Sequence, residues 1–205
     1  MNVSEPSRDG NALLLGPRGG DGYTSPHYYR PVSSASGFPP SQANAFELSL
    51  YYYFRNNSWS NCGASSAVQA LEFVISKRSG ASFLEWAVQW MNVGPGANGC
   101  DGRPRWRLWT AQRQDAWMDI VEEKVASNQW HFFRLRGDVR DGQVRYLEFQ
   151  TDDQTLGLGQ TFPAVSAPPL EQLAVALQPD ANSNNDSYDF VVDQVALQWY
   201  DASPW

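Results

Sequence analysis

Apolar and polar residues alternate along most of the chain, with the period of two that is typical of half-buried antiparallel strands. This pattern predicts ten strands: Ala12–Leu15, His27–Val32, Ala45–Phe54, Val68–Ser76, Phe83–Val93, Arg105–Thr110, Trp130–Val139, Gln143–Thr151, Leu173–Gln178 and Phe190–Tyr200. The clearest connection is Arg140-Asp141-Gly142, between two of these strands. Because Asp-Gly accepts the positive φ values of a tight turn, we expect a hairpin there.

Only one segment has helical spacing. Within Asp115–Ala126, the apolar residues Trp117, Ile120, Val121 and Val125 follow a helical period, although a strand through Trp117–Val121 fits nearly as well. Short strands joined by Gly- and Pro-containing turns, without alternating helices, predict an all-β fold with at most one or two short helices. We expect a two-sheet antiparallel sandwich or a barrel, as a single domain over residues 1–205 with a loose segment at 1–8.

Charge and composition exclude some partners. The chain has 205 residues and a formal net charge of −7, which makes nucleic acid a poor partner because phosphates need a surface rich in Lys and Arg. No apolar run approaches the length of a membrane helix, so we expect no membrane insertion. No signal-peptide pattern follows Met1. We expect a secreted or cell-surface protein whose leader is absent from this chain, with the cytoplasm as the alternative. Cys62 and Cys100 could form one disulfide, or none.

Aromatic residues are unusually abundant, with 9 Trp, 9 Tyr and 10 Phe. Flat rings beside polar side chains form surfaces on which sugar rings stack and to which sugar hydroxyls bind. The region from Glu85 to Trp109 is richest in this combination. Trp109 shares a strand face with Arg105 and Arg107, which favours an exposed position, whereas Trp86 and Trp90 share theirs with Val88. The candidate ligand-binding residues are Trp109, Arg107, Trp86, Trp90, Gln89, Glu85 and Tyr146.

Carboxylates provide an enzymatic alternative. Glycoside hydrolysis needs two carboxyl groups roughly 5–10 Å apart. Glu72, Glu85 and Glu148 lie in predicted strands and are the candidate acid/base residues, but the sequence does not tell which strands are neighbours. The other interpretation is that they belong to solvated strand faces. His131 could act as the base for a catalytic Ser, but the sequence contains no G-x-S-x-G nucleophile-elbow motif.

One carboxylate lies in an apolar setting. Asp193 interrupts the run Phe190-Val191-Val192-Asp193-Gln194-Val195, and a buried carboxylate needs a partner. That partner could be backbone or Arg, or a structural calcium ion. Asp180-Ala181-Asn182-Ser183-Asn184 opens like a calcium loop, but Asn185 and Val191 stand where an EF-hand needs Gly and Glu.

Two segments resemble jelly-roll carbohydrate-binding modules and concanavalin A-like lectin and glucanase sandwiches. They are Asp9-Gly10-Asn11-Ala12-Leu13-Leu14-Leu15 and the closing strand Tyr188–Leu197. Between them, Trp130-His131 followed by Asp141-Gly142 resembles a hairpin of laminin-G-like and lyase-like sandwiches. The resemblance implies a jelly roll with a concave, aromatic-lined face for glycans. It also implies a calcium ion near the first and last strands, held by Asp193 and Asp9. The E-x-D-x-x-E signature of the glucanases is absent, as are the R-[S/T]-E and Q-[I/V]-H motifs of alginate-lyase relatives, so no catalytic residue is transferred.

From these observations we expect non-catalytic binding of a polysaccharide. The alternative is a glycan-cleaving enzyme, a hydrolase or a lyase, on the same fold. A third possibility is a structural or adhesive surface protein whose aromatic residues form an assembly interface.

Overall fold

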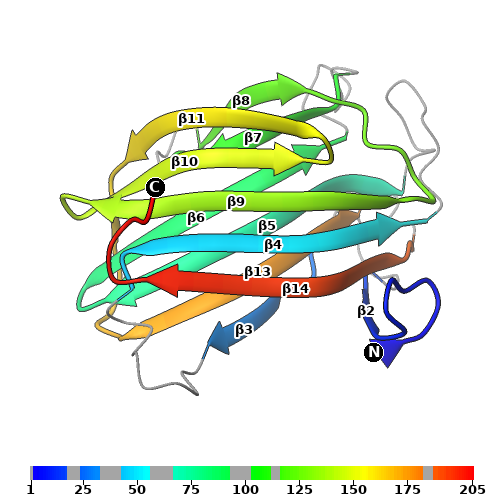
Figure 1. Ribbon diagram of the computed structural model, residues 1–205, viewed down its shortest axis with the longest axis horizontal. Helices are drawn as coiled ribbons and strands as arrows, with labels where there is room; N and C mark the ends of the chain where they lie inside the picture. The colour runs from blue at the N-terminus through cyan, green and yellow to red at the C-terminus, as the bar shows by residue number, and fades with distance from the viewer. Residues whose placement is uncertain are drawn as a thin grey trace.

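Two antiparallel sheets packed face to face make up the regular structure of the computed structural model (Figure 1). The structure describes residues 2–17, 24–32, 43–55, 67–92, 103–111, 116–181 and 187–205. Within these ranges every regular element is a strand, which confirms the predicted all-β sandwich. None of the described segments forms a helix with the length and apolarity that a membrane span requires. Cys62, Cys100 and most of the calcium-like turn lie outside the described residues.

The first sheet has seven strands. In spatial order they are β1 (Asn2–Val3), β2 (Ala12–Leu15), β14 (Phe190–Tyr200), β4 (Ala45–Phe54), β9 (Trp130–Arg140), β10 (Gln143–Thr151) and β11 (Gln154–Phe162). The N-terminal residues 2–8, which the sequence suggested would be loose, make contacts with this sheet. β1 pairs with β2, and Asp193 on β14 accepts hydrogen bonds from Ser7 and Arg8.

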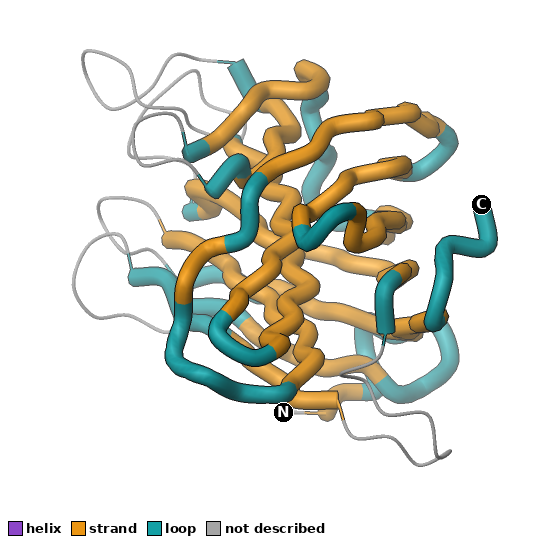
Figure 2. The backbone as a smooth tube through the Cα atoms, turned by 90° about the vertical axis from the view of Figure 1, so that its left-hand side faces the viewer, coloured by secondary structure: helices purple, strands orange, loops and turns teal. Residues whose placement is uncertain are grey.

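The second sheet lies behind the first in Figure 1 and is separated from it in the side view of Figure 2. Its order is β3 (Tyr28–Val32), β13 (Gln172–Ala181), β5 (Val68–Ser79), β6 (Ser82–Met91), β7 (Arg105–Trp109) and β8 (Trp117–Glu122), while the short β12 (Val165–Ser166) pairs with the start of β6. Sequence-distant strands therefore become neighbours, since β13 hydrogen-bonds to both β3 and β5.

Aromatic side chains fill the space between the sheets. Phe73 from the second sheet stacks on Phe133 from the first, with ring centroids 4.3 Å apart. Trp86 crosses the interface and donates its indole N–H to the carbonyl of Arg145 at 3.1 Å. Gly137 makes this approach possible, because a Cβ there would lie 2.5 Å from the Trp86 ring. Burying an indole contributes roughly 4–6 kcal/mol of hydrophobic free energy. Three of the nine Trp residues, Trp86, Trp90 and Trp106, are fully buried in this core.

The predicted hairpin is confirmed, and the prediction of a helix within Asp115–Ala126 is wrong for the residues that the structure describes. Asp141 and Gly142 join β9 to β10 with φ values of 53° and 71°, the left-handed conformation that this turn needs. Residues 117–122 form strand β8 against β7, as the alternative expected. Sheet pairing overrides the helical spacing there because β8 satisfies its backbone on the open edge of β7. The sequence prediction missed β11, whose exposed segment Gln154–Phe162 lacks clear alternation.

Candidate functional site

A row of polar side chains crosses the outward face of the second sheet. Antiparallel register places opposite residues on the same side of a sheet. The row consists of Gln178 on β13, Glu72 on β5, Gln89 on β6, Arg107 on β7 and Asp119 on β8, each opposite the next. The alternate residues of β5 and β6, such as Phe73 and Val88, point into the core. Strand alternation therefore forces this polar set onto one face.

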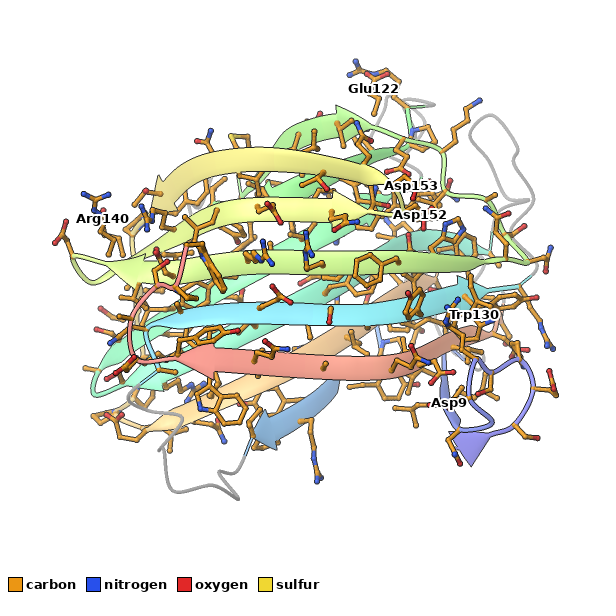
Figure 3. All side chains as sticks on the ribbon, in the orientation of Figure 1. Asp9, Glu122, Trp130, Arg140, Asp152 and Asp153 are labelled. Atoms are coloured by element: carbon orange, nitrogen blue, oxygen red, sulfur yellow. The ribbon has the colours of Figure 1, made fainter. Side chains whose placement is uncertain are left out.

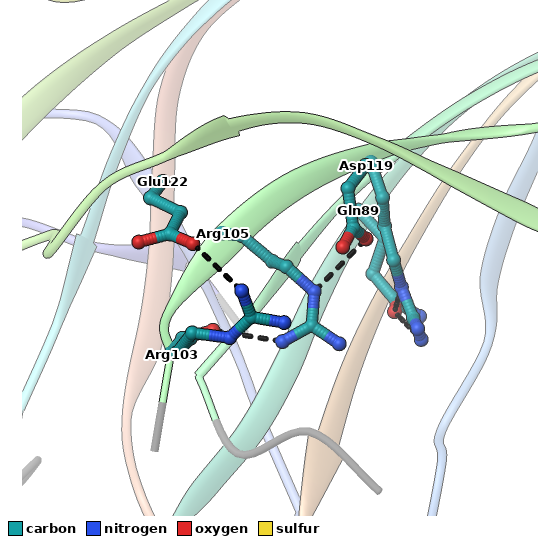
Figure 4. Close-up of polar contacts among 6 residues, drawn as sticks. Gln89, Arg103, Arg105, Asp119 and Glu122 are labelled. Carbon is teal, nitrogen blue, oxygen red and sulfur yellow. Dashed lines mark hydrogen bonds and ion pairs between the residues drawn. The ribbon is translucent and has the colours of Figure 1, made fainter. Parts of the chain in front are cut away.

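Three members of the row form a continuous hydrogen-bonded chain. Arg107 Nε donates to Gln89 Oε1 at 2.8 Å, a contact drawn in Figure 4, and Gln89 Nε2 donates to Glu72 Oε2 at 3.1 Å. The amide of Gln89 thus joins a cation to a carboxyl group. Arg105 lies two residues before Arg107 on β7, and its Nε donates a hydrogen bond to Asp119 Oδ1 at 2.9 Å (Figure 4). That ion pair leaves Arg107 as the cation that faces the centre of the row.

Small and aromatic side chains form the next row along the strands. Ala176, Val74 and Ala87 pack together on this face, with Trp109 and Trp117 against them. The two Trp rings lie 5.3 Å apart, edge to face, and the guanidinium of Arg107 lies 4.9 Å from the Trp117 ring centre. The two indoles thus lie beside the polar row on β7 and β8, and the short side chains lie beside it on β13, β5 and β6. Short side chains next to a pair of indoles suit a flat, hydroxyl-bearing ligand.

The carboxyl groups of this face are strongly perturbed. Burial, reinforced by the nearby charge of Asp180, raises the pKa of Glu72 from 4.5 to about 7. Burial also raises the pKa of Glu85 to about 7, and raises that of Asp180. Burial and the neighbouring Arg105 lower the pKa of Arg107 to about 10. Glu72 and Glu85 therefore exchange protons near neutral pH, a property that marks functional sites.

The structure divides the predicted ligand-binding residues into two groups. Glu85, Gln89, Arg107 and Trp109 all lie on the outward face of the second sheet. Trp86, Trp90 and Tyr146 are completely buried between the sheets. The Tyr146 hydroxyl is held by main-chain groups, among them the N–H of Ala87. These three residues are unavailable to a ligand, because they point between the sheets and have no accessible surface.

Of the predicted acid/base residues, Glu148 is separated from the other two. Glu148 lies on the outward face of the first sheet and pairs with Arg134 and Arg136 at 2.8 and 3.1 Å. Glu72 and Glu85 share the outward face of the second sheet, but Glu85 lies four residues along β6 from Gln89, the partner of Glu72. That offset is about 13 Å along the strand, too far for one hydrolytic pair.

Sequence reasoning missed Asp180, Gln178 and Trp117. Gln178 donates to Asp180 at 3.0 Å, and Asp180 is a diagonal neighbour of Glu72 because it lies opposite Ala70. The alternation of β13 does place Gln178 and Asp180 on one side, so the signal was present. Nothing in the sequence showed that β13 and β5 are adjacent. Trp117 was missed because its segment was interpreted mainly as a helix.

The residues implied as calcium ligands do not fit a calcium site. Asp193 is buried, and its oxygens accept hydrogen bonds from Ser7 Oγ (3.0 Å), Arg8 N (2.6 Å) and Gln194 N (2.7 Å). Amide N–H groups satisfy a carboxylate but cannot ligate a cation. Asp9 is exposed and accepts from the N–H of Asn11. No cluster of three or more His, Cys, Asp or Glu side chains suited to a metal occurs among the described residues.

Comparison with known proteins identifies similar folds. A scan of protein-family models found no match, and a search of curated proteins found none. The structure is similar to the marine PL-14 alginate lyase from Aplysia kurodai, at 11% identity over 97% of this chain and 86% of that one, with a TM-score of 0.56. It is also similar to the endo-β-1,4-glucuronan lyase from the fungus Trichoderma reesei (14% identity, 96% and 85%, TM-score 0.52) and to alginate lyase Aly36B (11%, 93% and 81%, TM-score 0.55). Identities this low show the fold.

These comparisons correct the functional expectation. The β-sandwich fold that the sequence predicted is shared with these structures. The expectation of a non-catalytic binding module is wrong, because the similar structures named here are polysaccharide lyases.

Proposed function

We propose that the protein is a polysaccharide lyase that cleaves a uronate-containing glycan on the outward face of the second sheet. The observation that carries the proposal is the hydrogen-bonded chain from Arg107 through Gln89 to Glu72. It places a cation and an amide beside a carboxyl group whose pKa is about 7, on the fold that the lyases share.

The chemistry of elimination assigns a role to each member. Breaking the C5–H bond of a uronate requires that the charge of its C5 carboxylate be offset, which the Arg107 guanidinium supplies with support from Gln89. Glu72 takes the C5 proton, because a carboxyl group with a pKa near 7 is partly ionised at neutral pH. The C4–O4 bond breaks as the C4=C5 double bond forms, and Glu72 returns the proton to O4. Trp109 and Trp117 stack against sugar rings next to the reacting one.

Charge on this face limits the working pH. A polyanionic substrate is repelled by ionised carboxyl groups, and Glu72 and Glu85 lose their protons as the pH rises through about 7. Below that pH both are largely neutral, while Arg107 keeps its charge. We therefore expect affinity for a uronate oligosaccharide to fall as the pH rises above 7, whereas catalysis needs the ionised fraction of Glu72. The rate should peak near pH 7.

The test is an assay of the purified protein on alginate, polyglucuronate and polygalacturonate, with an uncharged glucan as the negative substrate. Elimination gives an unsaturated product that absorbs in the ultraviolet. Glu72→Gln and Arg107→Ala should each lower the rate by at least about a hundredfold, as removal of a proton-transfer or charge-stabilising group does. The matched control is Glu148→Gln, a strand carboxylate on the opposite face. The proposal fails if no uronate polymer gives an absorbing product.

A second candidate function is glycan hydrolysis, and one observation supports it. Glu72 and Asp180 are diagonal neighbours on adjacent strands, about 7 Å apart at Cβ, and the charge of Asp180 raises the pKa of Glu72. That spacing falls within the range of hydrolytic carboxyl pairs. New reducing ends without ultraviolet absorbance would identify hydrolysis. For either reaction we place the protein outside the cell, where polymeric glycans are accessible.

A further inference from the structure

A pocket lies on the outward face of the first sheet, on the opposite side of the sandwich from the polar row. Its volume is about 560 Å³, within the range of ligand-binding pockets. Its lining consists of Tyr51, Trp130, Phe132, Gln150, Asp152 and Asp153. Figure 3 shows Trp130, Asp152 and Asp153 at the same end of the sheet, where β9 begins and β10 ends. We call these six residues the aromatic pocket. None of them was predicted from the sequence to bind a ligand.

The aromatic side chains of this region are paired across neighbouring strands. Tyr51 lies opposite Phe132 and Tyr53 opposite Trp130, with ring centroids 5.1 and 5.5 Å apart. They alternate with Tyr52, Phe54, His131 and Phe133, all of which point into the core. The four outward rings are partly exposed and add nothing to the space between the sheets. Core packing therefore does not explain them.

Hydrogen bonds fix the position of Asp152, which forms part of the polar side of the pocket. Asp152 accepts a hydrogen bond from Phe132 N at 2.8 Å, and its other oxygen lies 2.7 Å from His131 Nδ1. His131 Nε2 lies 2.7 Å from the carbonyl of Ala126. Because both neighbours accept hydrogen bonds, these contacts favour the doubly protonated, positively charged form of the His131 ring. His131 is buried, so it fixes Asp152 in place and offsets its charge.

Two further polar groups face the pocket. Gln150 donates its amide N–H to the carbonyl of Asp152 at 2.8 Å, which orients its Oε1 as an acceptor. The carboxylate of Asp153 is exposed, and no described residue pairs with it. The lining includes no Lys or Arg, and the nearby guanidinium of Arg8 lies over the Tyr51 ring, 3.7 Å from its centre. The six lining residues thus offer aromatic faces and hydroxyl acceptors, and the charged groups among them are carboxylates.

We propose that the aromatic pocket is a second glycan-binding site, separate from the polar row, which takes uncharged pyranose rings. A pyranose places its C–H face on Trp130 or Phe132 and its hydroxyls on Gln150 and Asp153. A uronate is disfavoured because its carboxylate would meet Asp153 and Asp152. The site does not depend on the proposed elimination, since it shares no residue with the polar row. The second site would bind the protein to a neutral glycan and leave the outward face of the second sheet accessible to the substrate of the proposed lyase.

The experiment is calorimetric titration of the whole protein with cellohexaose, laminarihexaose and mannohexaose, and with a hexamer of mannuronate as the charged comparison. We expect one of the neutral hexamers to bind and Trp130→Ala to weaken that binding at least tenfold. The matched control is Trp205→Ala, because Trp205 is also exposed but packs on Arg136 and Tyr200, away from the pocket. Asp153→Ala and Gln150→Ala test the polar side with little risk to folding, and each should weaken binding several-fold.

The two proposals fail separately. Glu72→Gln should leave binding of the neutral hexamer unchanged, whatever it does to elimination. If no neutral hexamer binds, or if binding is unaffected by the Trp130, Gln150 and Asp153 substitutions, the pocket is not a glycan site. Binding of tetramethylammonium in preference to every hexamer would also overturn the proposal, because it would identify the pocket as a cation site.

Discussion

Replacing Glu72 by glutamine should stabilise the protein at neutral and alkaline pH. The carboxyl group of Glu72 is partly buried and has a pKa of about 7, against 4.5 when unfolded. The folded chain therefore holds this proton more tightly than the unfolded chain. By linkage, the stability that depends on it is complete below pH 4.5 and is lost as the pH rises through 7. Glutamine resembles the protonated form and avoids this loss.

The magnitude follows from the pKa. A rise from 4.5 to about 7 corresponds to about 3 kcal/mol at most, because the carboxyl group keeps part of its hydration. Near pH 4 the variant and the parent protein should be equally stable. At pH 8 the variant should be more stable by up to that amount, which for a chain of this size is up to about 10 °C in Tm.

Thermal and urea unfolding at several pH values between 4 and 8 measures this effect. The control is Glu122→Gln, since Glu122 is exposed and pairs with the exposed Arg103. Its unfolding curve should follow the parent protein within about 0.5 kcal/mol at every pH. Groups that have no charge coupling to Glu72 contribute equally to both proteins and cancel in the difference. Asp180 and Glu85 do not cancel, because their charges help to raise the pKa of Glu72, so their contribution to the difference is part of the same effect. If the difference between Glu72→Gln and the parent protein does not grow with pH, the reasoning about this site is refuted.

Two further predictions concern the core. Gly137→Ala should destabilise the protein by about 1–3 kcal/mol in urea unfolding, because the new Cβ would lie 2.5 Å from Trp86. The control is Gly157→Ala, whose new Cβ would meet no atom within 4 Å and which should change stability little. Equal effects of the two substitutions would contradict the proposed contact. Burial is the largest single influence on His131 and lowers its pKa, but the hydrogen bonds to Asp152 and to the Ala126 carbonyl, together with the charges of Asp152 and Glu123, outweigh it and leave the pKa raised. The stabilising effect of the charged ring should therefore be present below pH 6.5 and lost at higher pH. Accordingly, His131→Gln should cost more stability at pH 6 than at pH 9, and a cost independent of pH would contradict a charged ring.

The proposed site illustrates a conflict between stability and function. Glu72, Glu85 and Asp180 all have pKa values raised by burial, so each destabilises the folded chain once it is ionised. A face without a ligand would gain stability from neutral side chains in these positions. Their presence together is therefore better explained by the chemistry of a bound glycan than by the fold.

Much of the local structure could be predicted because alternation is a property of consecutive residues. The strands around Phe46, Val88 and Leu135 and the turn at Asp141 followed from their own neighbours in the chain. So did the shared face of Arg107 and Trp109. Local information failed at β8, where two periods fitted one segment, and the hydrogen-bonding edge of β7 favoured the strand.

The assembly of the site depended on pairings between distant segments. β13 lies about a hundred residues beyond β5, yet its position beside β5 puts Asp180 next to Glu72, while Glu148 goes to the other sheet. Alternation separates the two faces of a strand but does not say which one is inside. For Trp86 and Trp90 that choice came from the packing of one sheet against the other, since only the space between the sheets removes a whole indole from water.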